Sequence, residues 1–144
     1  MDKKRPIVLP SITFKVISPQ GTIFTTISEL DKAPFEVFVN VGKGGSEVCA
    51  EAESIGRLIS LVLRSNMEKP TIERLRLVVG QLINVGSKES IGFGPNRVSS
   101  IPDGIAKTLV AYLDYKAQQV EIKQENALFA SEFITPYPCP NNPI

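Results

Sequence analysis

The sequence contains no histidine, and it has only two cysteines in 144 residues. Histidine is the most frequent general base and a common metal ligand, so its absence excludes the usual serine-hydrolase and cysteine-protease triads and most zinc and iron sites. Cys49 and Cys139 lie too far apart in sequence to indicate a disulfide framework or a thiolate zinc cage. Hydrolysis by paired carboxylates stays open, but the acidic residues are scattered. We therefore expect a protein that is not an enzyme and that holds no metal and no cofactor.

An excess of charge and a long apolar run are also missing. Sixteen basic residues against 15 acidic ones leave a formal net charge of +1, so no overall field favours long nucleic acid or a membrane surface as the partner. No uninterrupted apolar run approaches the length of a transmembrane helix, and the charged start has no secretory signal after it. We expect a cytoplasmic protein that is long enough to form one domain with its own core.

The first third of the chain predicts three strands. Apolar and polar residues alternate over residues 11–16 and again over 35–41, and residues 22–28 are rich in β-branched side chains. The segment Ser18-Pro19-Gln20-Gly21 has the composition of a tight turn. We therefore expect a three-stranded antiparallel meander, which an extended lead-in at residues 1–10 precedes.

The rest of the chain predicts helices. Apolar residues recur at helical spacing over 47–66, and a second amphipathic pattern runs from Pro70 to near Gly86. Ser100, followed by Pro102 and Asp103, predicts the start of a third helix. The predicted fold class is α+β, with two to three helices packed on the meander. The domain is expected to span residues 11–130, and a proline-rich tail is expected at 131–144.

Three features predict self-association. Ala52, Gly56 and Ser60 recur every four residues and give the first helix a lane of small side chains, along which another helix could approach closely. Residues 118–129 are mostly polar with isolated apolar positions, as in a helix that meets another subunit. A small sheet with exposed edges also leaves apolar surface to cover. We expect a homodimer or a larger homo-oligomer, with either the lane or residues 118–129 at the interface.

A glycine-rich turn joins the third strand to the first helix, in the segment Gly42-Lys43-Gly44-Gly45-Ser46. The first N–H groups of a helix have no partner within the helix, and the helix dipole adds positive charge there. Lys43, with the N–H groups of Gly44, Gly45 and Ser46, could therefore bind an anion such as phosphate. The alternative is that the glycines only allow the chain to turn tightly.

A second glycine-rich segment, residues 87–100, brings an aromatic ring, an amide and a guanidinium together in Phe93, Asn96 and Arg97. These groups suit a nucleobase and its phosphate. The alternative is that Phe93 fills the core while the glycines bend the loop. Arg57, on the first helix, could bind phosphate or could be a solvated partner of Glu53. We expect a nucleotide-derived ligand between the turn and the loop. Phe93 would stack on the base, Asn96 would contact a base edge or ribose, and Arg57 and Arg97 would bind phosphate.

Several motifs in this sequence together resemble the TSCPD domain. That domain is the small module near the C-terminus of adenosylcobalamin-dependent ribonucleotide reductases, and it also occurs as a free-standing protein, including in phages. The resemblance runs from Leu9 to about Leu113. Its motifs are Leu9-Pro10, Pro34-Phe-Glu-Val-Phe38, Gly42-Lys-Gly-Gly45, Glu51-Ala-Glu-Ser-Ile-Gly-Arg-Leu-Ile-Ser60, Leu63-Arg-Ser65, Gly92-Phe-Gly-Pro-Asn-Arg97 and Pro102-Asp-Gly-Ile-Ala106.

The resemblance implies two functions. One is sequestration of a nucleotide-derived signalling molecule, a cyclic ADP-ribose isomer or a cyclic oligonucleotide, in the manner of the phage Thoeris anti-defence sponges. The other is an accessory subunit or regulatory domain that binds the catalytic chain of an adenosylcobalamin-dependent ribonucleotide reductase. A structural or interaction module without a small ligand is a third interpretation. The chain is too short for the catalytic barrel, and Cys139-Pro140 is the only trace of the family's cysteine-rich knuckle. Neither ribonucleotide reduction nor a dithiol relay is therefore expected of it.

Overall fold

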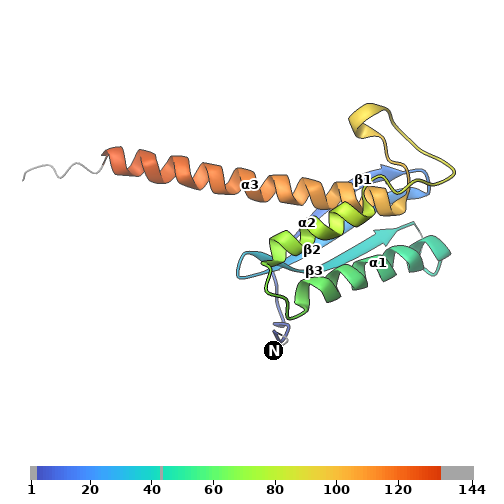
Figure 1. Ribbon diagram of the computed structural model, residues 1–144, viewed down its shortest axis with the longest axis horizontal. Coiled ribbons are helices and arrows are strands. Elements are labelled where there is room, and N and C mark those ends of the chain that lie inside the picture. The colour runs from blue at the N-terminus through green and yellow to red at the C-terminus, as the bar shows by residue number, and fades with distance from the viewer. Residues whose placement is uncertain (1–2, 43, 134–144) are drawn as a thin grey trace, which may run out of the picture. The chain divides into compact units, whose positions relative to one another are not determined.

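The computed structural model describes residues 3–42 and 44–133, with side chains up to Leu128, and it contains three strands followed by helices (Figure 1). The chain divides into two compact units between Leu113 and Asp114, earlier than the domain end expected near residue 130. In order, the elements are β1 (Ser11–Ser18), β2 (Gly21–Leu30), β3 (Ala33–Val41), α1 (Glu47–Arg64), α2 (Thr71–Leu82), a 3-10 turn (Gly94–Asn96) and α3 (Ile101–Phe133).

The sheet is the antiparallel meander that the sequence predicts, in the order β1-β2-β3. The β1–β2 turn lies at Pro19 and Gln20, as expected. The β2–β3 turn consists of Asp31 and Lys32, which both have positive φ angles of 53° and 64°. Two positive φ angles suit the twist of a tight hairpin, and such turns usually contain glycine or asparagine. The residue types at this turn therefore gave little sign of it.

One face of the sheet forms the core, and the other face is open. Side chains of β2 and β3 that alternate onto the inner face are almost completely buried against α1, α2 and the first part of α3; they include Ile23, Ile27, Val37, Val39 and Val41. The opposite face presents Ile17, Phe24 and Phe38, each roughly half exposed. The fold class is α+β, as predicted.

The predicted helices are present, with small shifts at their ends. α1 begins after Ser46, whose hydroxyl accepts a hydrogen bond from the N–H of Cys49 at 3.2 Å. α2 ends at Leu82, before the expected end near Gly86. The hydroxyl of Ser100 accepts from the N–H of Asp103 at 3.1 Å, which confirms the predicted start of α3. α3 continues to Phe133, so residues 131–133 of the expected tail are helical. Between residues 3 and 133, Lys43 excepted, no helix is long and apolar enough to span a membrane.

The lane of small residues on α1 packs against β3 of the same chain. A Cβ atom added to Gly56 would lie 3.1 Å from the carbonyl oxygen of Val37 and 3.3 Å from the nitrogen of Val39. The Ser60 hydroxyl accepts a hydrogen bond from the N–H of Val37 at 2.9 Å. The same hydroxyl donates to the carbonyl oxygen of Val37 at 3.1 Å. The prediction that this lane forms a dimer interface is therefore wrong. An interface at residues 118–129 stays a prediction.

Two side-chain hydrogen bonds join the first part of α3 to β2. The hydroxyl of Thr108 donates to that of Thr25 at 2.8 Å, and the Tyr112 hydroxyl donates to Glu29 Oε1 at 2.7 Å. Burial, and then the neighbouring carboxylate of Glu29, raise the pKa of Tyr112 above its ordinary value. Tyr112 is therefore a neutral donor that orients the helix over the sheet.

Candidate functional site

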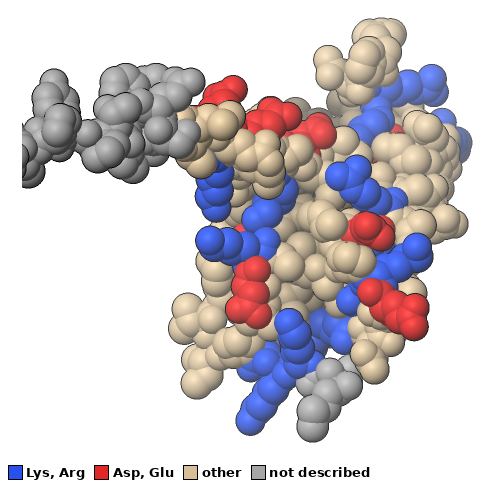
Figure 2. Space-filling model, turned by 60° about the vertical axis from the view of Figure 1, so that its left-hand side comes forward, with Lys and Arg blue, Asp and Glu red and all other residues tan. Residues whose placement is uncertain are grey.

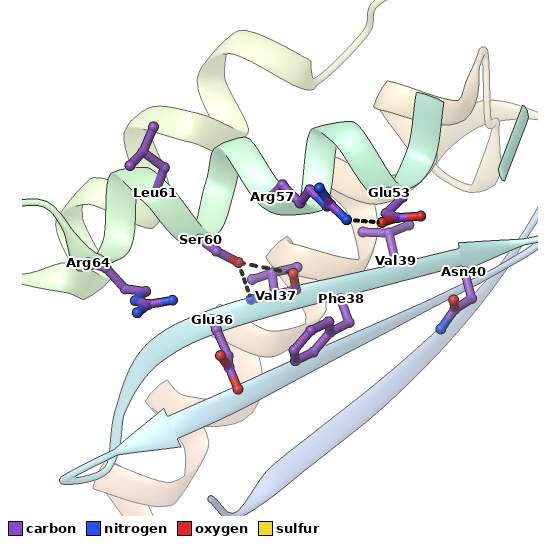
Figure 3. Close-up of a pocket in the computed structure, with 10 residues that line it drawn as sticks. All are labelled: Glu36, Val37, Phe38, Val39, Asn40, Glu53, Arg57, Ser60, Leu61 and Arg64. Atoms are coloured by element: carbon purple, nitrogen blue, oxygen red, sulfur yellow. Dashed lines mark hydrogen bonds and ion pairs between the residues drawn. The ribbon is translucent and has the colours of Figure 1, made fainter. Parts of the chain in front are cut away.

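A groove of about 700 Å³ lies between α1 and β3 and is called here the α1/β3 groove (Figure 3). This volume lies within the usual range of about 300–1,000 Å³ for small-molecule sites. Five residues of β3 and five of α1 line the groove: Glu36, Val37, Phe38, Val39, Asn40, Glu53, Arg57, Ser60, Leu61 and Arg64.

The local sequence explains why side chains of both elements reach this groove. Strand alternation places Phe38 and Asn40 on the face opposite the buried valines of β3. Arg57 and Arg64 are seven residues apart on α1, close to two helical turns, so they project from the same side of the helix. Because Gly56 and Ser60 let the α1 backbone approach β3, the two rows lie beside each other along the groove (Figure 3).

Some charged side chains of the groove are held in ion pairs, and others are not. Arg57 Nη2 lies 2.6 Å from Glu53 Oε1, and the Arg57 side chain is 80% exposed. Glu36 is almost fully buried, and the guanidinium of Arg5 binds both of its carboxylate oxygens at 2.8–3.0 Å. Arg64 lies over the ring of Phe35, 5.1 Å from its centroid, and among the described residues no carboxylate pairs with it. Arg64 is therefore the cation in the groove that is available to an anion.

The groove can bind and orient a ligand without chemical catalysis. Phe38 is 50% exposed and offers a ring face for stacking. Asn40 offers an amide donor and acceptor, and a guanidinium matches the geometry of phosphate. Among the side chains that the structure describes, no group of three or more acidic or cysteine residues could hold a metal ion. The arrangement therefore suits an anion that carries an aromatic ring.

The predicted anion-binding turn lies at the N-terminus of α1. Gly42 and Gly45 have positive φ angles of 62° and 81°, which explains the need for glycine there. Ser46 caps the helix, and Glu47 already places a carboxylate in its first turn. Gly44 is exposed, and Lys43 lies outside the described residues. The interpretation of these glycines as turn formers agrees with the structure, and anion binding at the turn stays a prediction.

The loop that carries Phe93, Asn96 and Arg97 is held at its base and exposed at its tip. Asp103 is fully buried, and its carboxylate accepts from the N–H groups of Asn84 and Ser99, each at 2.8 Å. Phe93 is 93% exposed, so the alternative in which it fills the core is wrong. Asn96 and Arg97 are also exposed.

The Asp103 carboxylate also accepts from Lys107 Nζ at 2.8 Å. Burial on its own would raise the pKa of Asp103, but the hydrogen bonds from Lys107, Ser99 and Asn84 outweigh it and lower this pKa from its ordinary value. The carboxylate therefore stays charged and keeps both ends of the loop closed at neutral pH.

Of the seven predicted binding residues that the structure describes, Arg57 alone lines the α1/β3 groove. Its ion pair with Glu53 confirms the interpretation of Arg57 as a partner of that carboxylate. The described residues of the turn, Gly44, Gly45 and Ser46, are absent from the groove lining, and so are Phe93, Asn96 and Arg97 of the loop. A ligand between the turn and the loop stays a prediction, and the groove is a separate candidate.

Sequence reasoning missed Phe38 and Asn40 as site residues. A signal was present, because the same alternation that buries the valines of β3 places an aromatic residue at a position normally occupied by a polar one. Phe38 shares this face with the exposed side chains of Phe24 and Ile17, and apolar side chains that gather on one face often mark a binding surface.

The wider surface adds no strong field. On the face that Figure 2 shows, basic and acidic side chains are interspersed, in keeping with a net charge of +1. Attraction of an anion must therefore come from particular residues near the site, such as Arg64, because opposite charges close to one another cancel at a distance.

Comparison with known proteins gives one match. A family model described as the TSCPD domain matches residues 3–113, which include the whole sheet, α1, α2 and the start of α3. No curated protein and no solved structure matches the chain.

Proposed function

The chain belongs to the TSCPD domain family, and we propose that it is a non-enzymatic binding protein that sequesters a nucleotide-derived signalling molecule. The ligand would be a cyclic ADP-ribose isomer or a cyclic oligonucleotide, as for a phage anti-defence sponge. The observation that carries the proposal is the α1/β3 groove, which combines two guanidinium groups with a half-exposed ring and an amide. Sequestration needs burial, stacking and charge-assisted hydrogen bonds, and it needs no catalytic group.

Within this proposal, each side chain has a distinct role. Phe38 stacks on the base, and Asn40 hydrogen-bonds its edge or a ribose hydroxyl. Arg64 binds phosphate, and Arg57 exchanges Glu53 for a phosphate oxygen. Two acidic side chains in the groove disfavour a ligand with several adjacent phosphates.

Calorimetric titration with cyclic ADP-ribose isomers and cyclic dinucleotides tests the proposal. Phe38→Ala should lower the affinity of the ligand tenfold to hundredfold, since stacking on one base is worth about 1–3 kcal/mol. Phe24→Ala is the matched control, because Phe24 is a similarly exposed ring on the same sheet that does not line the groove. If no compound in the panel binds the wild-type protein, the proposal is wrong.

The loop is tested in the same experiment. Phe93→Ala should leave the affinity unchanged if one chain's groove is the whole site. A loss of affinity in Phe93→Ala with none in Phe38→Ala would instead move the site to the loop that carries Phe93. Native mass spectrometry of the protein purified from cells would show any retained nucleotide and the size of the expected homo-oligomer.

A second candidate function is an accessory subunit of an adenosylcobalamin-dependent ribonucleotide reductase. The observation in its favour is the open face of the sheet, where Ile17, Phe24 and Phe38 are exposed together. Exposed apolar residues that gather on one face are typical of a docking surface. Co-sedimentation with the catalytic chain of such a reductase tests it, and Phe24→Ser should weaken the association while it leaves nucleotide binding unchanged.

A further inference from the structure

A second, smaller pocket lies where the end of α1 meets the start of α2. Its volume is about 160 Å³, too small for a nucleotide but large enough for one phosphate group. Three basic side chains line this α1/α2 pocket, those of Lys3, Arg64 and Arg74, and no acidic side chain does. The pocket is therefore more consistently positive than the α1/β3 groove, although the groove is larger.

Arg74 is the unusual member, because it is only 8% exposed and has no carboxylate partner in the described part of the chain. Its Nη1 lies 2.7–3.1 Å from the carbonyl oxygens of Val62, Leu63 and Ser65, and its Nε donates to that of Lys69 at 2.7 Å. These contacts satisfy carbonyl groups at the end of α1, which otherwise carry partial negative charge. Arg74 therefore offsets the partial negative charge of these carbonyl groups, which would otherwise repel an anion from this pocket.

One nitrogen of Arg74 remains. Nη2 makes no hydrogen bond to any described residue, yet no buried side-chain nitrogen or oxygen in that part of the protein lacks a partner. Nη2 must therefore keep contact with solvent, and Arg74 lines the pocket. A nearly buried guanidinium that keeps an unpaired N–H group beside a cavity is a preformed donor for an oxyanion.

The other walls supply further donors. Thr71 is the first residue of α2 and lines the pocket, and Pro70, the N-cap, provides no side-chain hydrogen bond to the helix. The first N–H groups of α2 therefore have no side-chain cap to compete with an anion. Asn66 adds a side-chain amide. Lys3 forms a long and largely exposed ion pair with Asp31, at 3.8 Å, and such a pair is weak in water.

We propose that the α1/α2 pocket is a phosphate-binding site in which Arg74, Arg64 and Lys3 hold one phosphate group. This goes beyond the proposed function, because it needs no ligand in the groove. Arg64 lines both cavities. A phosphate in the pocket therefore shares a guanidinium with any anion in the groove. The phosphate can be free in solution, or it can belong to a ligand whose remainder extends past Arg64.

The test is a titration of the isotope-labelled full chain, in which NMR follows the backbone amides of Thr71, Ile72 and Asn66. Inorganic phosphate, adenosine monophosphate and adenosine are the three arms, at ionic strength matched with sodium chloride. We expect phosphate to shift these amides in a saturable way and adenosine to leave them unchanged. Shifts with the monophosphate but not with free phosphate would also support the site, and would assign the phosphate to a larger ligand.

Variants test the cations that are proposed to hold the phosphate. Arg64→Gln should weaken phosphate binding about tenfold or more, because a charge-assisted hydrogen bond is lost. Lys3→Gln should have a smaller effect, since Lys3 is exposed. Arg76→Gln is the control and should bind phosphate as the wild type does, because Arg76 is an exposed arginine of α2 that lines neither cavity.

Two results would overturn the phosphate site. One is the absence of saturable shifts at these amides with either phosphate-bearing probe at tens of millimolar. The other is a phosphate affinity that is equal in the wild type and Arg64→Gln. If Phe38→Ala loses nucleotide binding but keeps phosphate binding, the loss concerns the groove alone. Failure of the phosphate site and failure of the proposed function are therefore distinguishable.

Discussion

The two edge strands of the sheet differ in whether another element of the chain covers them. At the β3 edge, α1 lies against the strand, and Ser60 contacts both the N–H and the carbonyl group of Val37. At the β1 edge, no described group bonds the backbone of Thr13 or Lys15 on the side away from β2. One edge is therefore closed within the chain, and the other is open to solvent.

The hydrogen-bonding pattern shows which backbone groups face outward. The N–H of Glu29 donates to the carbonyl oxygen of Pro10, so the alternation of an antiparallel ladder directs Ile12 and Phe14 toward β2 and Thr13 outward. Lys15 also faces outward, and a lysine on an edge strand discourages pairing with another strand. The groove lies at the closed edge. α1 therefore both covers the edge of β3 and forms one wall of the candidate site.

The largest expected effect is a difference between two proline substitutions. Thr13 and Thr26 lie opposite each other, and their hydroxyls are 2.8 Å apart, so Thr13→Pro and Thr26→Pro remove the same side-chain contact. The N–H of Thr26 faces β3, whereas that of Thr13 faces solvent. We expect Thr26→Pro to lower the free energy of unfolding by about 3 kcal/mol or to prevent folding, and Thr13→Pro to cost about 1 kcal/mol.

Urea unfolding followed by circular dichroism measures this difference. Equal losses in the two proline variants would mean that the β1 edge is not open in solution, for example because a second copy covers it. Sedimentation of the wild type at tens of micromolar would then show a dimer.

The next effect concerns the close approach of α1 to β3. Gly56→Ala should destabilise the protein by about 1–3 kcal/mol, because the new methyl group would meet the backbone of Val37 and Val39 and the Cγ2 methyl group of Val39. Gly80→Ala is the matched control, since nothing lies within 4 Å of an added Cβ there. Gly80→Ala should stabilise α2 by about 0.5–1 kcal/mol. Thermal unfolding of both variants should give shifts of opposite sign, and a shift of the same sign would contradict the packing of Gly56.

A smaller effect is expected from the hydroxyl group that closes the β3 edge. Ser60→Ala leaves the N–H of Val37 without its partner, which should cost about 1 kcal/mol, because water in the groove can take the place of the hydroxyl group. Ser54→Ala is the control, because the Ser54 hydroxyl bonds only to the carbonyl of Ala50 on an exposed turn of α1. The amide of Val37 should also exchange its hydrogen faster in Ser60→Ala. An unchanged exchange rate would show that the bond is not kept in solution.

The contrast between the edges also shows what the sequence could predict. Alternation in the strands and helical spacing in α1 predicted the meander and its helices, because these patterns report which side chains are buried. The lane of Ala52, Gly56 and Ser60 predicted close backbone approach correctly, but assigned it to another subunit. Small side chains create the same space whether a strand of the same chain or a foreign helix fills it, and the sequence carries no signal that separates the two.

The candidate site was less predictable for a related reason. Arg57 was predicted to bind phosphate and lies in the groove, but the groove also needs Phe38 and Asn40, which come from a different element. Their proximity depends on how closely α1 approaches β3, which is a property of the packing. Likewise, Ser100 and Asp103 predicted a helix start, whereas the bonds from Asn84 and Ser99 that make Asp103 the base of a loop appear only in three dimensions.

The smallest expected effect on stability belongs to Arg57, which separates binding from folding at the closed edge. Arg57→Gln removes the 2.6 Å pair with Glu53, but exposed pairs at this helical spacing contribute only about 0.3–0.5 kcal/mol. The aliphatic part of the side chain remains, so the free energy of unfolding should change by no more than that. If the guanidinium binds a desolvated phosphate in the groove, the same variant should bind the nucleotide at least tenfold more weakly. A large loss of stability would make Arg57 a structural residue of the closed edge, and unchanged affinity would remove it from the site.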